Sequence, residues 1–248
     1  MPFSLSKEEE VRYRRQLIVP DVGAGGQRQL KQATIMIAGL GGLGSISAYY
    51  MAAAGVGHLK IVDIDRVAGH NLNRQILYNT ADIGKLKTDS AREKLTALNP
   101  ACHIETLPAR INDDTVDAMV DGCDLILDGT DNVETRRVLN RSAQGEGIPF
   151  IFGGVNGFDG MLSTFIPGRS ACLECIWPGA PGRSHEEIGI IGPTVGVIAS
   201  LQCVEAMKIL IGRGADLSGI LVHFHGLGMR IKKTVVEPDP DCRVCSRK

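Results

Sequence analysis

A glycine-rich turn is the first feature of this sequence with a recognisable chemistry. The stretch IAGLGGLG places Gly39, Gly41 and Gly44 in the spacing G-x-G-x-x-G, between an apolar run and a segment of helical composition. In that setting the first glycine permits a tight turn, the second lets a phosphate approach the backbone, and the third lets the helix pack closely on the strand. The turn therefore predicts a phosphate-binding loop at the start of a helix.

An acid follows this loop at the distance that ribose binding requires. Asp63 closes the second apolar run, HLKIVD, 19 residues after Gly44. A carboxylate at the end of that strand can accept hydrogen bonds from ribose hydroxyls. NAD, FAD and ATP all fit these facts, so the loop and its acid predict a nucleotide without choosing among the three.

Cationic and amide side chains beyond Asp63 favour a triphosphate. Asn71 and Arg74 lie in HNLNRQILY, and Lys87 lies in GKLKTDSA. A triphosphate carries more charge than the pyrophosphate of a dinucleotide, and breaking it calls for cations on the leaving group. Asp131-Asn132 follows the strand-like DLILDGT, at the edge where such sheets bind ligands, and its carboxylate suits Mg²⁺. Taken singly, Arg74 and Lys87 also fit ordinary surface charges.

Four of the seven cysteines form two C-x-x-C pairs, Cys172 with Cys175 and Cys242 with Cys245. Each pair offers two thiolates from one turn, and two such turns complete a tetrahedral zinc site. Four protein ligands leave no open position, so the zinc would be structural and would hold the C-terminus against the body of the protein. A redox dithiol and unpaired loop cysteines are the alternatives.

The order of apolar and helical segments predicts an α/β fold. Strands are expected at 34–38, 58–63, 102–107 and 124–127, and helices at 43–54, 85–98, 115–120 and 133–143. This alternation is typical of a parallel sheet covered on both faces. From Pro149 strands follow one another, apart from a helix at 195–211. We expect a Rossmann-like, mostly parallel sheet with helices on both faces, extended by antiparallel strands and ending in a zinc-pinned C-terminus.

The composition of the chain limits the kinds of binding partner and the number of domains that we expect. The chain has 248 residues, 44% of them hydrophobic, and a formal net charge of −1. Nothing in that balance favours nucleic acid or a membrane surface, and polar residues interrupt the longest apolar run, so we expect a cytoplasmic protein. We expect one domain, with a helical arm at 1–33, a nucleotide-binding half at 34–155, and an antiparallel extension at 156–248 that carries a crossover loop and the zinc site.

The segments IAGLGGLG, IVDIDRVAGHNLNRQ, GKLKT and LDGTDN, in this order, resemble the adenylating domain of the MoeB/ThiF/HesA family, the prokaryotic relatives of ubiquitin-activating enzymes. RYRRQL at 12–17, the C-x-x-C pairs and GPTVGVIASLQCVEAMKIL fit the same pattern, so the resemblance covers essentially the whole chain. It implies that ATP lies across the glycine loop. The implied nucleotide-binding residues are Gly39, Gly41, Gly42, Gly44, Asp63, Asp65, Asn71, Arg74, Gln75, Lys87, Asp131 and Asn132.

The resemblance also implies a reaction, the formation of an acyl-adenylate. A carboxylate, in the family usually the C-terminal glycine of a small ubiquitin-fold carrier protein ending in Gly-Gly, attacks the α-phosphorus and releases pyrophosphate. Arg74 and Lys87 hold the phosphates and Asp131 binds Mg²⁺. Arg15 reaches the nucleotide site of a neighbouring subunit, which implies a homodimer with composite sites. The cofactors implied are ATP, Mg²⁺ and a structural zinc bound by the four paired cysteines.

Two segments depart from the family pattern. The crossover loop PGAPGRSHEEIGIIG has no cysteine near Ser184 and His185, where members that form a thioester place one. We therefore expect the reaction to stop at the acyl-adenylate. The strand LVHFHG carries His225 where relatives often carry an acid, which could mark an unusual substrate.

The remaining cysteines, Cys102, Cys123 and Cys203, are expected to be inert buried thiols.

Taken together, the motifs and the resemblance predict adenylation of a sulfur carrier for molybdopterin or thiamine-type biosynthesis. A small-molecule or peptide carboxylate in cofactor biosynthesis is the alternative substrate. A nicotinamide-dependent oxidoreductase and a non-catalytic, dimeric nucleotide-binding module are the more remote alternatives.

Overall fold

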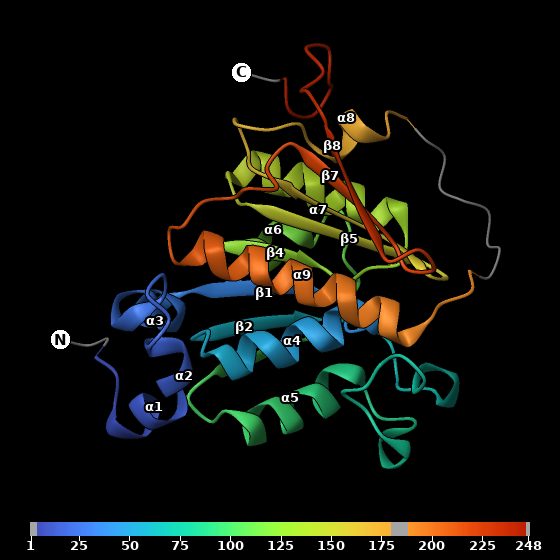
Figure 1. The fold of residues 1–248 in the computed structure, drawn as a ribbon. Coiled ribbons are helices and arrows are strands. Elements are labelled where there is room, and N and C mark those ends of the chain that lie inside the picture. Colours follow the sequence, from blue (N-terminus) through green and yellow to red (C-terminus); the bar gives the residue numbers. More distant parts are fainter. Residues whose placement is uncertain (1–3, 180–187, 247–248) are drawn as a thin grey trace.

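One eight-stranded sheet organises the computed structural model, which describes residues 4–179 and 188–246 (Figure 1). Its strands are β1 (Thr34–Ala38), β2 (His58–Val62), β3 (His103–Leu107), β4 (Leu125–Asp128), β5 (Phe150–Asn156), β6 (Asp159–Phe165), β7 (Ile220–His225) and β8 (Arg230–Val235). The spatial order is β3-β2-β1-β4-β5-β6-β7-β8. Pairing is parallel from β3 to β5 and antiparallel from β5 to β8. The predicted parallel sheet with an antiparallel extension is confirmed.

Helices cover both faces of this sheet. They are α1 (Lys7–Arg12), α2 (Arg14–Leu17), α3 (Gly23–Gln32), α4 (Gly42–Ala54), α5 (Lys87–Leu98), α6 (Val116–Val120), α7 (Val133–Glu146), α8 (Leu173–Ile176) and α9 (Gly192–Leu210). In Figure 1, α4, α5 and α9 lie in front of the sheet, and α6 and α7 lie behind it. Strand β1 shows the result, because Ile35 and Ile37 belong to one apolar core whereas Met36 and Ala38 belong to the other. A strand buried on both faces reads as a continuous apolar run.

The expected element boundaries lie within three residues of the observed ones, and the largest differences are the start of α9 at Gly192 instead of 195 and the end of α7 at Glu146 instead of 143. Helix α5 begins at Lys87 rather than at residue 85, because the carbonyl of Lys85 accepts a bond from Val67 N (3.0 Å) and Leu86 forms a β-bridge with Arg66. Strand β3 begins at His103, so Cys102 lies in the preceding turn. The short helix α8 was not predicted, because a single turn carries no apolar periodicity.

Helix α9 is long and apolar enough to span a membrane by length and composition, with a mean hydropathy of 1.3. In the fold it packs against α4, β5 and β6. The contacts are close, since a Cβ placed at Gly160 would lie 2.4 Å from the side chain of Ile198. This helix is therefore part of the protein core, and its packing against α4 and the sheet accounts for its apolar composition.

The N-terminal helices are fastened to the end of the sheet where the parallel strands begin. Helix α3 ends at Gln32, immediately before β1, and α2 packs on α3. Asn99 Nδ2 donates to the buried Tyr13 hydroxyl (2.8 Å), and Lys31 forms an ion pair with Glu9 (2.7 Å). Helix α2 therefore lies at the amino ends of the parallel strands, opposite to the carboxyl ends where the glycine loop lies (Figure 1).

The buried carboxylate of Asp82 fixes the loop that joins β2 to α5. It accepts hydrogen bonds from Asn79 N (2.8 Å) and Lys85 (3.3 Å), and it pairs with Lys94 on α5. Burial alone would raise its pKa, but these donors outweigh burial and lower the pKa of Asp82 to about 2. The ionised form is therefore stabilised in the folded state.

We predict that Asp82→Asn lowers the free energy of unfolding at pH 7 by about 2–3 kcal/mol, the linkage value of a pKa shift of this size. Because the folded-state pKa lies below the unfolded value, this stability is present above about pH 4 and is lost as the pH falls towards 2. Denaturant titrations at several pH values measure the difference. The exposed Asp114→Asn is the control, and an equal loss in both variants, or one that persists at pH 2, would contradict the assignment.

Candidate active site and metal centre

The glycine loop joins β1 to α4 through a backbone conformation that only glycine adopts readily. Gly39 has a φ of 86°, and its N–H donates to Val62 O (2.8 Å). A Cβ at Gly44 would lie 1.8 Å from Gly39 O, so a side chain there would break the loop. Helix α4 begins at Gly42 and directs its free N–H groups to the mouth of the loop. The predicted succession of strand, glycine turn and helix is present.

Asp63 is held against this loop. It lies one residue beyond β2, and its Oδ2 accepts a hydrogen bond from Leu40 N (2.7 Å) while its Oδ1 accepts one from Asp65 N (2.8 Å). The carboxylate therefore occupies the carboxyl end of β2 beside the glycine turn. This is the place from which an acid can reach the ribose of a nucleotide in such a sheet.

Lys87 is a buried cation rather than a surface charge. Its Nζ lies 2.8 Å from Asp65 Oδ2 and 3.6 Å from Asp63 Oδ2, and the side chain is only 6% exposed. An ammonium carries three donors, and the contact with Asp65 uses one of them. Lys87 is therefore positioned beside Asp63 and Asp65 and keeps donors for a further anion.

Asn71, Arg74 and Gln75 follow one another around a short 3-10 turn (η1, Gly69–Asn71) beside the glycine loop. Asn71 Oδ1 accepts from Ala68 N (3.2 Å), which fixes the turn. A Cβ at Gly41 would lie 3.8 Å from Gln75 Nε2, and one at Gly42 would lie 3.8 Å from Arg74 Cγ. Gln75 is buried, and its Oε1 has no hydrogen-bond partner among the described residues.

Arg74 is half-buried, and its guanidinium is held only by its own turn. Its Nη1 donates to His70 O and to Asn73 Oδ1, each at 3.0 Å. No carboxylate pairs with Arg74 within the described part of the chain. Among the described residues no acid compensates its charge, which leaves the guanidinium open to an anion at the glycine loop.

Asp131 and Asn132 lie at the carboxyl end of β4, in contact with the glycine loop through the backbone of Gly129. A Cβ at Gly129 would lie 2.5 Å from Gly39 O. Asn132 caps α7, with its Oδ1 accepting from Thr135 N (2.8 Å), and its Nδ2 donates to Asp131 Oδ1 (3.3 Å). The Asp131 carboxylate is exposed, so it has room for a hydrated cation.

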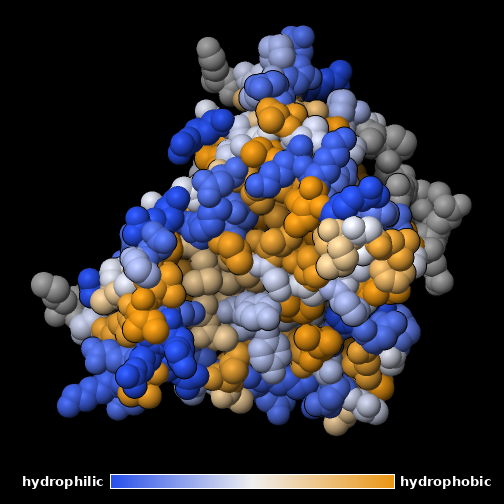
Figure 2. Space-filling model, viewed as in Figure 1, coloured by the Kyte–Doolittle hydropathy of each residue, from blue (hydrophilic) through white to orange (hydrophobic). Residues whose placement is uncertain are grey.

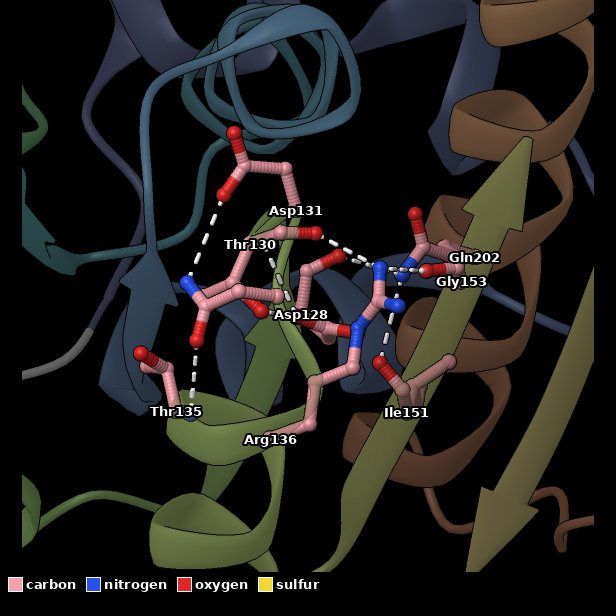
Figure 3. A network of polar contacts seen from close by, with 9 residues as sticks. Asp128, Thr130, Asp131, Thr135, Arg136, Ile151, Gly153 and Gln202 are labelled. Carbon is pink, nitrogen blue, oxygen red and sulfur yellow. Dashed lines mark hydrogen bonds and ion pairs between the residues drawn. The ribbon is translucent and has the colours of Figure 1, made fainter. Parts of the chain in front are cut away.

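A buried ion pair that the sequence analysis did not identify fixes the loop before Asp131 (Figure 3). Arg136 Nε lies 2.9 Å from the fully buried Oδ2 of Asp128, the last residue of β4. Its Nη2 donates to Thr130 O (2.6 Å) and to Gly153 O on β5 (2.9 Å). Gln202 of α9 adds bonds to Asp128 O (2.9 Å) and Ile151 O (3.2 Å). The sequence carried one signal of this ion pair, because the acid Asp128 at the end of the apolar strand LILD needs a buried cation.

Two of the residues singled out in the sequence, Arg15 and His225, are not gathered at this site. Arg15 is exposed on α2, at the opposite edge of the sheet, so it does not contribute to the site of its own chain. His185 lies outside the described residues. His225 ends β7 and pairs through Nδ1 with Asp159 Oδ1 of β6 (2.6 Å).

The two C-x-x-C pairs come together although they are far apart in sequence. Their four Sγ atoms lie within 4.8 Å of one another. The closest separations are 3.4 Å for Cys175–Cys245, 3.6 Å for Cys172–Cys242 and 3.9 Å for Cys172–Cys175. A tetrahedron of thiolates about 2.3 Å from zinc has edges of about 3.8 Å, whereas a disulfide requires about 2.05 Å. The donor set therefore fits a closed, structural zinc site.

The other three cysteines are buried, as expected. Burial raises the pKa of Cys102 and of Cys203 to about 12 and that of Cys123 to about 11. A thiol with such a pKa is almost wholly protonated at neutral pH and is a poor nucleophile. None of these three thiols has the environment of a thioester-forming residue.

Comparisons with known proteins agree with this geometry. The ThiF family profile matches residues 13–244. The sulfur carrier protein adenylyltransferase of Thermus thermophilus is 38% identical over 97% of this chain and 92% of its own length. The molybdopterin-synthase adenylyltransferase of Escherichia coli is 36% identical over 98% of this chain and 99% of its own length. The crystal structure of E. coli MccB with MccA-N7isoASN shares the fold, with a TM-score of 0.87 at 22% identity over 99% of this chain and 76% of that one.

The cysteine geometry predicts one zinc ion per chain. Cys172→Ser and Cys245→Ser should lose the metal and lower the unfolding temperature, because a closed site of this kind contributes its binding free energy to folding. Elemental analysis by mass spectrometry and thermal unfolding are the measurements. Cys203→Ala, a cysteine outside the cluster, should keep the metal, and protein purified without chelator that holds no zinc would refute the assignment.

Proposed function

Because the chain belongs to the ThiF family, we propose that it is an ATP-dependent adenylyltransferase that acts on the C-terminal glycine of a small ubiquitin-fold carrier protein. The observation that carries this proposal is the agreement between identity and geometry. Relatives named as sulfur-carrier and molybdopterin-synthase adenylyltransferases are 36–38% identical over almost the whole chain. One edge of the sheet brings together the glycine loop, Asp63 as the candidate ribose-binding acid, and Arg74 and Lys87 as the candidate phosphate-binding cations.

In the proposed complex ATP lies across the glycine loop, with its ribose hydroxyls on Asp63 and its phosphates at the N-terminus of α4. Arg74 binds the phosphates through its guanidinium, which pairs with no acid among the described residues. Lys87 supplies a point charge from its place between the two acids. Asn71 and Gln75 add neutral donors, and Asp131 is the residue that would hold Mg²⁺, which would supply positive charge against the phosphates.

The reaction needs no protein nucleophile. One carboxylate oxygen of the substrate attacks the α-phosphorus, a new phosphorus–oxygen bond forms, and the bond to the bridging oxygen breaks, so that its electron pair leaves with pyrophosphate. The protein aligns the two reactants and stabilises charge on the phosphates, which is the task of Arg74 and Lys87. The products are the acyl-adenylate and pyrophosphate. Because Cys102, Cys123 and Cys203 are buried and protonated, the acyl group passes from the adenylate to a nucleophile outside the protein.

We assign the substrate to a carrier protein rather than to a peptide or a small acid. MccB, which was solved with MccA-N7isoASN, matches at 22% identity, and a likeness at that level extends to the fold alone. The relatives with higher identity are named for sulfur carriers and molybdopterin synthase. A role in molybdopterin or thiamine-type cofactor biosynthesis in the cytoplasm follows from this assignment.

The same proposal includes a homodimer with composite sites, in which residues 1–248 of each chain act as one adenylation domain. Arg15 lies at the edge of the sheet opposite to the nucleotide site of its own chain, so a catalytic role for it requires a second chain. An apolar face is available for that contact. Val197 and Val204 on α9 are 38% and 54% exposed, and Tyr50 on the adjoining α4 is 54% exposed. A broad band of hydrophobic and intermediate residues covers this side of the protein in Figure 2.

The central test is carboxylate-dependent exchange of labelled pyrophosphate into ATP. Arg74→Ala should lower the exchange rate on the order of a hundredfold or more, because it removes a charge that stabilises the transition state. The unfolding temperature should hardly change, since Arg74 contacts only its own turn. Arg92→Ala, which removes an exposed arginine of α5, should leave exchange intact. Full exchange by Arg74→Ala, or no exchange by the wild type with any Gly-Gly carrier, would overturn the proposal.

A second prediction concerns the shared site. Arg15→Ala and Arg74→Ala chains should each be nearly inactive, but a mixture that has exchanged subunits should recover about a quarter of the wild-type rate. Half of the dimers are then mixed, and each mixed dimer has one intact site of two. The neighbouring Arg14→Ala should keep its activity. A fully active monomer, or an Arg15→Ala mixture without recovery, would exclude the composite site.

A further inference from the structure

Helix α7 carries a buried amide with an unused donor. Asn140 is only 1% exposed, and its Oδ1 accepts a hydrogen bond from the backbone N–H of Leu173 (3.0 Å), the first residue of α8. Because a backbone N–H can only donate, the oxygen of the amide must face Leu173 and the nitrogen must face elsewhere. That Nδ2 is buried and has no hydrogen-bond partner among the described residues. A buried N–H group without an acceptor is unfavourable, so Nδ2 points to an acceptor of another kind.

The first cysteine pair lies beside this amide. Leu173 directly follows Cys172 in the chain, so its bond to Asn140 holds the amide at the start of the turn that carries the pair. Burial raises the pKa of the Cys172 thiol, and the Asn140 amide acts in the opposite direction because it favours the thiolate. A neutral thiol is a weak acceptor, whereas a metal-bound thiolate carries negative charge and accepts hydrogen bonds more strongly. The sulfur of Cys172 is therefore the acceptor within reach of Nδ2.

Two other cysteines of the cluster receive hydrogen bonds from backbone N–H groups. Asp239 N donates to Cys175 Sγ (3.4 Å). Burial would raise the pKa of Cys242, but backbone N–H groups of its own turn outweigh burial and lower it. These donors belong to the C-terminal segment. Asn140 differs from them, because it is a side chain on a helix of the nucleotide-binding half.

A closed zinc site creates a need for such donors. Four thiolates around one Zn²⁺ leave a buried group with a net negative charge, and hydrogen bonds to the sulfurs disperse that charge. Arg137, on the same face of α7, is already committed, because it is paired with Glu174 of α8 (3.2 Å). The neutral amide of Asn140 supplies a donor to the sulfur without adding a further charge to the interior.

We propose that Asn140 is a positioning residue of the zinc site, which holds the Cys172 turn through Oδ1 and donates an N–H···S hydrogen bond through Nδ2 to the zinc-bound thiolate of Cys172. This inference rests on the zinc assignment and not on the proposed adenylation. It gives both ends of the amide a partner. It also ties the metal site, and with it the C-terminal segment, to the helix that begins beside Asp131.

The direct test is NMR on the full chain with an NMR-active cadmium isotope in place of zinc. Cadmium binds the same four thiolates, and an N–H···S bond to a metal-bound sulfur transmits scalar coupling between the metal and the amide proton. We expect a correlation between cadmium and a side-chain amide proton of Asn140, and its loss in Asn140→Leu. The backbone N–H of Asp239, which donates to Cys175 Sγ, is the internal control. Wild-type protein without the Asn140 correlation would overturn the proposal.

Zinc affinity separates the donor from the acceptor. Asn140→Asp keeps an oxygen for Leu173 N and loses the donor, whereas Asn140→Leu loses both without adding charge. Both variants should bind zinc about tenfold more weakly or worse, the usual effect of removing a hydrogen bond to a metal ligand. Competition with a chelator whose colour reports zinc gives the affinity. If Asn140 served only to hold Leu173 N, Asn140→Asp would bind zinc as the wild type does, and that result would contradict the proposal.

A matched control is available at Asn112. Its Oδ1 accepts from Asp114 N (3.0 Å) and Thr115 N (3.1 Å), so aspartate can accept the same bonds there. Asn112→Asp should keep the zinc affinity of the wild type, and an equal loss in this variant would show that the effect at Asn140 is not specific. Both measurements use the metal alone and no carboxylate substrate, so their outcome is independent of the adenylation. A wild-type chain that binds no zinc would overturn the metal assignment and this inference together.

Discussion

The close approach of three backbone segments sets the arrangement of the whole site. A Cβ at Gly44 would lie 1.8 Å from Gly39 O, and one at Gly129 would lie 2.5 Å from the same atom. These distances leave no space for side chains, so the loop after β1 and the loop after β4 touch through bare backbone. The contact brings the start of α4 and the Asp131 loop to the same point. Parallel pairing of β1 with β2 and β4 adds Asp63 to that point.

Charge is then distributed between pairs that stabilise the fold and groups that are left for a ligand. Asp128 is fully buried and is matched by Arg136, and Lys87 is matched by two acids. Such pairing is required, because an isolated buried charge is very unfavourable. Within the described part of the chain, Arg74 and Asp131 form hydrogen bonds only with side chains and carbonyls of their own turns. In the proposed complex, a polyphosphate and its cation would supply the partners that these two residues lack.

The sequence was sufficient for features that depend on local pattern. Strand β1 has the predicted bounds, and the glycine loop, the acid after β2 and the zinc-type cysteine cluster were all identified from residue types and spacing. Features that depend on which strands become neighbours were missed. Arg136 on α7 donates a hydrogen bond to Gly153 on β5, a strand that follows in the sequence. The turn that contains Phe158 and the turn that contains Leu227 meet only once the sheet is formed. The position of Arg15 at the far edge was likewise invisible in the sequence, since its motif carries no information about distance.

Isotope transfer tests directly which bond forms in the reaction. A Gly-Gly carrier labelled with heavy oxygen in its C-terminal carboxylate is incubated with ATP, the protein and an amine or thiol that captures the acyl group. If the carboxylate attacks the α-phosphorus, the released AMP keeps one labelled oxygen, because acyl transfer breaks the bond on the carbon side. Mass spectrometry of the nucleotide gives the answer. Labelled AMP with unlabelled pyrophosphate is the predicted result, and unlabelled AMP, or label in ADP or inorganic phosphate, would contradict the account.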